Sequence, residues 1–152
     1  MTDLPSTDEA APSLNALSSE SEIQLRGNKV LIVDDSRFNR QILARFVKWA
    51  GVSHIEFAAD GQEGLEKLET FAPDLILVDM GMPRLGGIEM TQKIRQNPAY
   101  ADLPILIQTT LNSDQQRVAC FKAGATDILS MPVNPGECMA RVRLHLEKLL
   151  LI

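Results

Sequence analysis

The sequence predicts an α/β protein with a single parallel sheet, because short apolar runs alternate with amphipathic segments along most of the chain. Short, continuous apolar runs bounded by polar residues are typical of strands that are buried on both faces. Four such runs are Val30–Val33, Leu75–Val78, Ile105–Ile107 and Ile128–Leu129. His54–Ala58 alternates between polar and apolar residues, which predicts a half-exposed edge strand.

Helical patterns fill the gaps between these strands. Apolar side chains recur at intervals of three and four residues after Ser36, in residues 61–71 and in residues 86–96. Ser113–Gln116 resembles a capping box, and Asn134 followed by proline and glutamate is typical of a helix start. Strand and helix alternate five times, and right-handed crossovers between parallel strands place helices on both faces of the sheet.

Length and composition are those of one globular domain preceded by a polar leader. The chain has 152 residues, of which 45% are hydrophobic, and this is enough to build one core. Residues 1–25 contain five acidic residues, no basic residue and few large apolar side chains, so we expect a flexible acidic leader. Because the leader carries the whole formal net charge of −5, the remainder is neutral and offers no basic stripe for direct nucleic-acid binding.

The sequence also favours a cytoplasmic protein without membrane contact. No apolar run approaches the roughly 20 residues of a membrane-spanning helix, and the N-terminus lacks the basic and apolar regions of a secretory signal. Cys120 and Cys138 are isolated, without a metal-binding spacing, and are expected to be small buried side chains in a reducing compartment.

Polar residues directly follow three of the predicted strands. Asp34 and Asp35 end the first strand, and Asp79 ends the third. Thr109 ends the fourth, and the carboxyl ends of parallel strands form the usual binding edge of such a sheet. Two carboxylates about 4 Å apart repel each other by about 4 kcal/mol at an effective dielectric constant near 20. A hard divalent cation relieves this repulsion, and carboxylate oxygens are typical ligands of Mg²⁺. Alternatively, Asp34 and Asp35 cap the helix that begins near Ser36, and Asp79 is an ordinary loop acid.

These strand ends carry a family resemblance. From Lys29 to about Leu149 the chain resembles the receiver domain of bacterial two-component response regulators. The matching segments are Val30–Asp35, Pro73–Pro83, Gly86–Gly87, Leu103–Ile105, Thr109 and Ala123–Ala125. The combination of three features is specific for this family: an acidic pair, a further acid after the third strand, and a Met-Pro shortly after that acid. The resemblance implies a flavodoxin-like fold over residues 26–152, with five parallel strands in the order 2-1-3-4-5 and five helices on both faces.

The resemblance also implies a role for each acidic residue. Asp79 is similar to the phosphoacceptor, which takes a phosphoryl group from a sensor histidine kinase, a phosphotransfer protein or a small phosphodonor. Asp35 and Asp79 are similar to direct Mg²⁺ ligands, with Asp34 acting through water and the Gly81 carbonyl completing the protein ligands. Thr109 is similar to the switch hydroxyl that binds the phosphoryl group. Such a domain is no enzyme beyond promoting its own phosphorylation and dephosphorylation, and phosphoryl transfer chiefly needs positioning and charge neutralisation.

Several positions depart from the family pattern. Met131 stands where the family usually carries lysine, and a thioether cannot replace the charged hydrogen bond. Arg84 is a candidate replacement, although an arginine in a turn is more often simply exposed. Ile128 stands at the position of the usual aromatic residue, Thr110 replaces a small residue, and Gly81 leaves the acceptor open to water. We expect Mg²⁺ binding and phosphorylation to persist, with weaker coupling to a conformational change.

The last helix permits two interpretations. Met139, Val142, Leu146 and Leu149 are spaced like a coiled-coil seam, or they form the core face of that helix. The apolar end suggests a homodimer, or a linker over residues 145–152 that leads to an output domain. Neither His54 nor His145 has a partner nucleophile or metal ligand within reach by its place in the sequence, so both are expected to be structural or exposed.

Two other functions compete with a phosphorylated receiver. The first is a pseudo-receiver that binds partners or dimerises without phosphorylation, as Met131 and Ile128 suggest. The intact acids argue against it, because a scaffold has no need for an acidic cluster. The second is a phosphatase with an aspartyl nucleophile, which would need Asp-x-Asp after the first strand, and Asp34-Asp35-Ser36 does not match.

Overall fold

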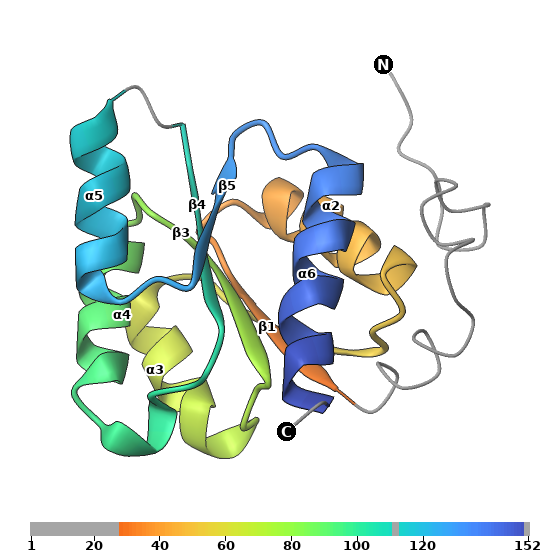
Figure 1. The fold of residues 1–152 in the computed structure, drawn as a ribbon, viewed down its shortest axis with the longest axis horizontal. Helices are drawn as coiled ribbons and strands as arrows, with labels where there is room; N and C mark the ends of the chain where they lie inside the picture. Colours follow the sequence, from red (N-terminus) through yellow and green to blue (C-terminus); the bar gives the residue numbers. More distant parts are fainter. Residues whose placement is uncertain (1–27, 111–112, 151–152) are drawn as a thin grey trace.

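Five parallel strands form one sheet in the computed structural model, which describes residues 28–110 and 113–150. Their order is β2-β1-β3-β4-β5, which confirms the predicted topology (Figure 1). The strands are β1 (Lys29–Val33), β2 (His54–Ala58), β3 (Leu75–Asp79), β4 (Ile105–Thr109) and β5 (Asp127–Ser130).

Helices cover both faces of this sheet, with α2 and α6 on one face and α3, α4 and α5 on the other (Figure 1). Their bounds are α2 (Arg37–Trp49), α3 (Gly61–Thr70), α4 (Gly87–Arg95), α5 (Asp114–Ala123) and α6 (Pro135–Leu150), and a short 3₁₀ helix, η2 (Pro98–Tyr100), precedes β4. No helix in the described part of the chain is both long enough and apolar enough to span a bilayer.

Side chains alternate along each strand between two hydrophobic clusters. In β1, Val30 and Ile32 pack with α2 and α6, whereas Leu31 and Val33 pack with α3, α4 and α5. All four are fully buried, which is why a strand between two helical layers has a continuous apolar run. Cys120 and Cys138 are free and buried, as their isolation in the sequence predicts.

Polar side chains cap the helices at the predicted places. The Ser36 hydroxyl accepts the amide of Asn39 at 3.2 Å, and the Ser113 hydroxyl accepts that of Gln116 at 3.3 Å. At the start of α6, the Asn134 side chain accepts an amide hydrogen bond at 2.9 Å. Each cap satisfies a backbone donor of the first turn, so the helices begin at fixed residues beside the carboxyl ends of the strands.

The seam interpretation of the last helix is wrong for three of its four residues. Met139, Val142 and Leu146 are fully buried in the cluster between α6, α2 and the sheet, so they form a core face. The side chain of Leu149 lies outside the described residues, as do the predicted leader and residues 151–152.

One histidine has a partner that the sequence pattern does not reveal. His145 on α6 is buried, and its Nε2 lies 2.9 Å from Oδ2 of Asp127 at the start of β5. Arg141 donates to the same oxygen at 2.6 Å. His145 is thus structural and His54 on the edge strand is exposed, as the sequence led us to expect, although the contact with Asp127 was not foreseen.

The two faces of α6 predict opposite responses to truncation. We expect Leu146→Ala to lower the free energy of unfolding by about 2–5 kcal/mol, because it leaves a cavity in the core. Leu144→Ala is the matched control, since Leu144 is 49% exposed, and its effect is expected to stay within about 0.5 kcal/mol. Urea unfolding measures both, and equal losses would contradict the assignment of Leu146 to the core.

Candidate functional site

Three carboxylates meet at the carboxyl end of the sheet. The register pairs Val33 of β1 with Val78 of β3, so the next residues, Asp34 and Asp79, end neighbouring strands at the same level. One carboxylate oxygen from each of Asp34, Asp35 and Asp79 lies within 4.8 Å of the others. The structure therefore brings together the acids that strand order alone led us to expect there.

Asp34 is the most firmly held of the three. It is fully buried, and its Oδ1 accepts the amide of Ser36 at 2.8 Å. Its Oδ2 accepts the Gln108 carboxamide at 2.6 Å, and its carbonyl oxygen accepts Arg40 at 2.7 Å. Because Ser36 caps α2, the alternative that Asp34 and Asp35 serve as the cap is wrong. The carboxylates of Asp34 and Asp35 are therefore not used as the helix cap and can belong to the cluster.

The charges in this cluster are not neutralised by neighbouring side chains. Burial, followed by the neighbouring Asp34 charge, raises the pKa of Asp79 to about 6, with the Gly81 amide acting in the opposite direction. Burial also raises the pKa of Asp34, against the hydrogen bonds from Ser36 and Gln108. No ion pair within residues 28–110 and 113–150 involves an acid of the cluster. The oxygen donors, their mutual spacing and their unrelieved charge all fit a hard divalent cation.

The loop after Asp79 is open on one side and tightly closed on the other. A Cβ atom at Gly81 would meet no atom within 4 Å, so the solvent side of the loop is open, as the sequence predicts. At Gly87 a Cβ atom would lie 2.6 Å from the Asp79 carbonyl oxygen, so only glycine allows α4 to begin this close to Asp79.

Arg84 does not take the place of the usual lysine. Its Nε donates to Asp60 Oδ2 at 2.8 Å, and its terminal nitrogen also bonds this oxygen. Asp60 caps α3, so the guanidinium ties the loop after β3 to that helix. The hypothesis that Arg84 supplies the missing charge to the acid cluster is therefore wrong.

The remaining predicted positions surround the cluster from β4 and β5. Thr109 is 2% exposed, and its hydroxyl has no hydrogen-bond partner among the described residues. Ile128 is buried in the cluster under α3, α4 and α5, so no aromatic ring is available there to move. Met131 is half-buried and lines a cavity of about 110 Å³ together with Gln108 and residues of α2.

Comparison with known proteins agrees with this geometry. A family model described as the response regulator receiver domain matches residues 30–143, which includes every acid of the cluster. The chain belongs to this family. The part of the chain that the structure describes is therefore a receiver domain, with the fold and strand order of the family.

Individual relatives show the same relationship. The chain is 39% identical over 120 residues to the response regulator MprA of Mycolicibacterium vanbaalenii, covering 79% of this chain and 51% of that protein. Among solved structures, a putative response regulator from Chloroflexus aurantiacus is 32% identical with a TM-score of 0.74, over 79% of this chain and 98% of that one. The chemotaxis protein CheY4 of Vibrio cholerae is 35% identical with a TM-score of 0.70, over 78% and 98%. The receiver chain spans about half the length of the curated relatives it matches.

Sequence reasoning missed Gln108 as a site residue. Its carboxamide reaches Asp34 across 74 positions of the chain, and such a contact leaves no mark in local spacing. The available signal was a polar residue within the apolar run of β4, where both faces of the strand are buried.

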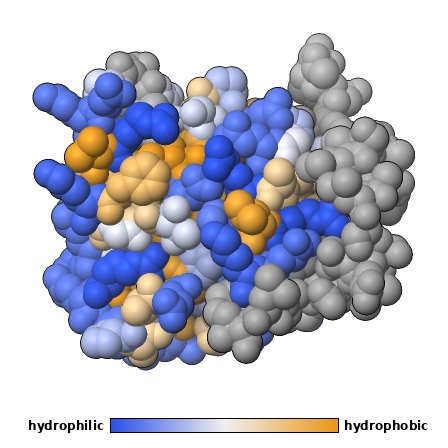
Figure 2. Space-filling model, viewed as in Figure 1, coloured by the Kyte–Doolittle hydropathy of each residue, from blue (hydrophilic) through white to orange (hydrophobic). Residues whose placement is uncertain are grey.

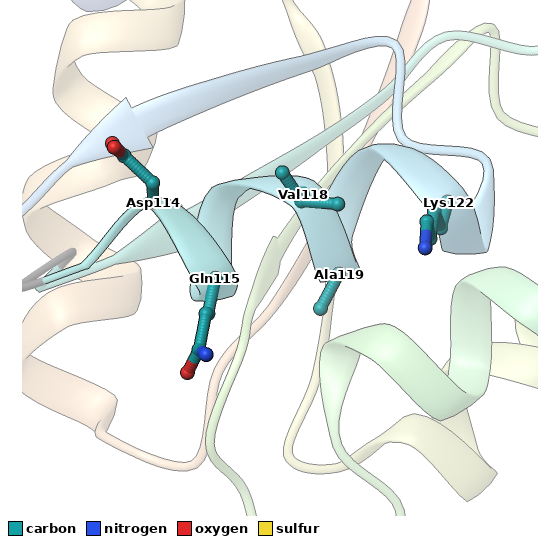
Figure 3. Close-up of a pocket in the computed structure, with 5 residues that line it drawn as sticks. All are labelled: Asp114, Gln115, Val118, Ala119 and Lys122. Carbon is teal, nitrogen blue, oxygen red and sulfur yellow. The ribbon is translucent and has the colours of Figure 1, made fainter.

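A second surface feature lies on α5 of the receiver. Five side chains of this one helix line a shallow depression of about 380 Å³ (Figure 3). Hydrophobic side chains gather over the same helix on the face shown in Figure 2, where Val118 and Phe121 are 48% and 46% exposed. None of the predicted site residues lines this depression.

The raised pKa of Asp79 predicts that its charge destabilises the metal-free receiver at neutral pH. The fold favours the protonated carboxyl, so this contribution to stability is present below about pH 4 and is lost as the pH rises through 6. The difference from 3.8 corresponds to at most about 3 kcal/mol, and partial solvent contact reduces it to about 1–2 kcal/mol. We therefore expect Asp79→Asn to raise the free energy of unfolding at pH 7 by about that amount.

Urea unfolding in the presence of a chelator, at pH 7 and at pH 4, tests this expectation. The gain should fall to a small remainder at pH 4, because Asp79 is then protonated in the folded state and only partly ionised in the unfolded state. Glu66→Gln is the control, since Glu66 is exposed on α3 and its effect should be within about 0.5 kcal/mol. A loss of stability in Asp79→Asn at pH 7 would show that the charge of Asp79 does not destabilise the folded state.

Proposed function

We propose that this receiver domain accepts a phosphoryl group on Asp79 in a Mg²⁺-dependent reaction and thereby controls a partner or an output domain. The convergence of Asp34, Asp35 and Asp79 at one sheet edge carries the proposal. In the reaction, an Asp79 carboxylate oxygen attacks phosphorus while the phosphorus–nitrogen bond of a phosphohistidine breaks. The imidazole leaves with the electron pair of that bond, and Asp79 becomes an acyl phosphate.

The surrounding residues are assigned by what each can donate or accept. Asp35, Asp79 and the Gly81 carbonyl would hold the cation directly, and Asp34 through water. When bound, Mg²⁺ would neutralise negative charge on the acids and the phosphoryl oxygens. Thr109 would donate its hydroxyl proton to a phosphoryl oxygen, which its unsatisfied and buried position supports. The Asp79 carboxylate must be ionised to attack, and the cation would favour that form.

We propose that phosphorylation of Asp79 is coupled to a conformational change more weakly than in most of the family. Met131 offers no charged donor, and Ile128 is an aliphatic side chain within the core. Two of the usual links between the acyl phosphate and the surface of the domain are thus missing. The Thr109 hydroxyl remains as the link from the site to β4.

A sensor histidine kinase or a phosphotransfer protein is the proposed phosphodonor, in the cytoplasm. Phe38 supports a docking contact beside the acids, because it is 64% exposed in the first turn of α2, three residues after Asp35. Phe57 of β2, 37% exposed, lines a shallow surface pocket with Arg37 and Arg40 of α2. Because His145 and Leu146 are buried in the domain, the proposed linker to an output domain or a second copy would begin after Leu146.

Phosphorylation can be tested directly with a small phosphodonor. We expect acetyl phosphate with MgCl₂ to add one phosphoryl group to the wild-type chain, because Asp79 is positioned as a nucleophile among the cation's ligands. Intact-protein mass spectrometry measures the adduct, which should be absent in Asp79→Asn and in the presence of a chelator.

Asp102→Asn provides a matched control. Asp102 is exposed in the loop before β4, so this variant should form the adduct as the wild type does. A wild-type chain without an adduct, or an Asp79→Asn chain that keeps it, would overturn the proposed function.

A further inference from the structure

Gln108 is a buried polar residue that contacts the acid cluster. It is 1% exposed, and its Nε2 donates to Asp34 Oδ2 at 2.6 Å. The register of β3 and β4 pairs it with Asp79, so it lies level with the acceptor on the neighbouring strand. The preceding residues of β4, Ile105–Ile107, are apolar, so the sheet itself does not require a carboxamide here.

Only one end of the carboxamide is engaged. Its Oε1 is buried and has no hydrogen-bond partner among the described residues. The nitrogen end must face Asp34, because the opposite orientation would set a carbonyl oxygen against a carboxylate. Leaving a buried acceptor unsatisfied is unfavourable, so the contact with Asp34 determines the orientation of Gln108.

Gln108 also faces the position where the family usually carries lysine. Gln108 and Met131 line the same cavity of about 110 Å³, beside Asn39 and Leu43 of α2. The methionine brings neither a charge nor a hydrogen-bond donor into this space. Two neutral donors to Asp34 nevertheless line it, Asn39 from α2 and Gln108 from β4, and Gln108 is the one next to the acceptor strand β3.

We propose that Gln108 is a positioning residue that orients Asp34 for Mg²⁺ and supplies from β4, without a charge, the hydrogen bond that residue 131 cannot supply. This inference rests on the proposed function of the same site. Both oxygens of Asp34 accept hydrogen bonds, Oδ1 from Ser36 and Oδ2 from Gln108, and the Asn39 side chain also donates to this carboxylate, which together fix its plane. A neutral donor does so without a positive charge that would repel the cation. Residues that orient direct metal ligands typically contribute about 10- to 100-fold to metal affinity, and the lower end applies to Gln108 because Asp34 is proposed to act through water.

A purely structural role for Gln108 makes a different prediction. It would lower fold stability on substitution and leave the affinity for the metal unchanged. Mg²⁺ affinity in the folded protein therefore separates the two roles, and it can be measured without any phosphodonor.

Isothermal titration of MgCl₂ into wild type, Gln108→Met and Leu106→Met tests the proposal. Gln108→Met keeps the length of the side chain but removes the donor, and we expect it to weaken Mg²⁺ binding about 10-fold. Leu106 is the matched control, because it is fully buried on the same strand and packs in the cluster under α2 and α6. Leu106→Met should bind Mg²⁺ within about twofold of wild type, since it touches none of the acids' hydrogen bonds.

A second measurement uses the wild-type chain and so does not depend on the folding of a variant. In nitrogen-15 NMR spectra, the side-chain amide of Gln108 should shift as MgCl₂ is added, whereas that of Gln115 on α5 should not. The inference would be overturned if folded Gln108→Met bound Mg²⁺ with wild-type affinity. It would also be overturned if the side-chain amide signal of Gln108 did not shift when Mg²⁺ binds. If the wild type binds Mg²⁺ and is phosphorylated but these results fail, only the inference fails. If it does neither, the proposed function fails first.

Discussion

The mutual repulsion of Asp34, Asp35 and Asp79 is the interaction on which the rest of this site depends. Their oxygens approach within 4.8 Å at the end of a sheet whose core is held by fully buried strands. Burial, followed by the charge of Asp34, raises the pKa of Asp79 to about 6, and the packing of the strands, not attraction between the acids, holds the cluster together. A site under this strain favours any cation or covalent change that removes negative charge from it.

The scaffold answers this repulsion by fixing the acids with neutral donors. Asp34 is held by the Ser36 amide and the Gln108 carboxamide, and neither adds a positive charge to the cluster. The nearby guanidinium of Arg84 is bound by Asp60 instead. The negative charge thus remains available to a divalent cation, and we infer that this arrangement favours metal binding over readout through a charged side chain.

The fold was predictable because it depends on patterns that are local in sequence. Apolar runs such as Val30–Val33 mark buried strands, and residues such as Ser36 and Asn134 mark helix starts, so topology followed from the rules for parallel crossovers. The acids were predictable because the carboxyl ends of parallel strands meet at one edge. The contacts of Gln108 and His145 were not, because each depends on side-chain reach between elements far apart in sequence. The spacing on α6 left the seam and the core face open for a related reason, since core packing and helix pairing share the same period.

Fold stability as a function of Mg²⁺ concentration tests the central claim most directly, namely that a divalent cation relieves the repulsion between these three acids. At constant ionic strength, MgCl₂ should raise the free energy of unfolding of the wild-type receiver by RT ln(1 + c/Kd), where c is the free Mg²⁺ concentration, that is, with the logarithm of c above Kd. The gain should reach about 2.7 kcal/mol when the cation is at a hundredfold excess over its Kd. Asp35→Asn, which removes a proposed ligand, should lose most of this gain. Wild-type stability that does not respond to Mg²⁺, or an equal response in Asp35→Asn, would contradict the claim.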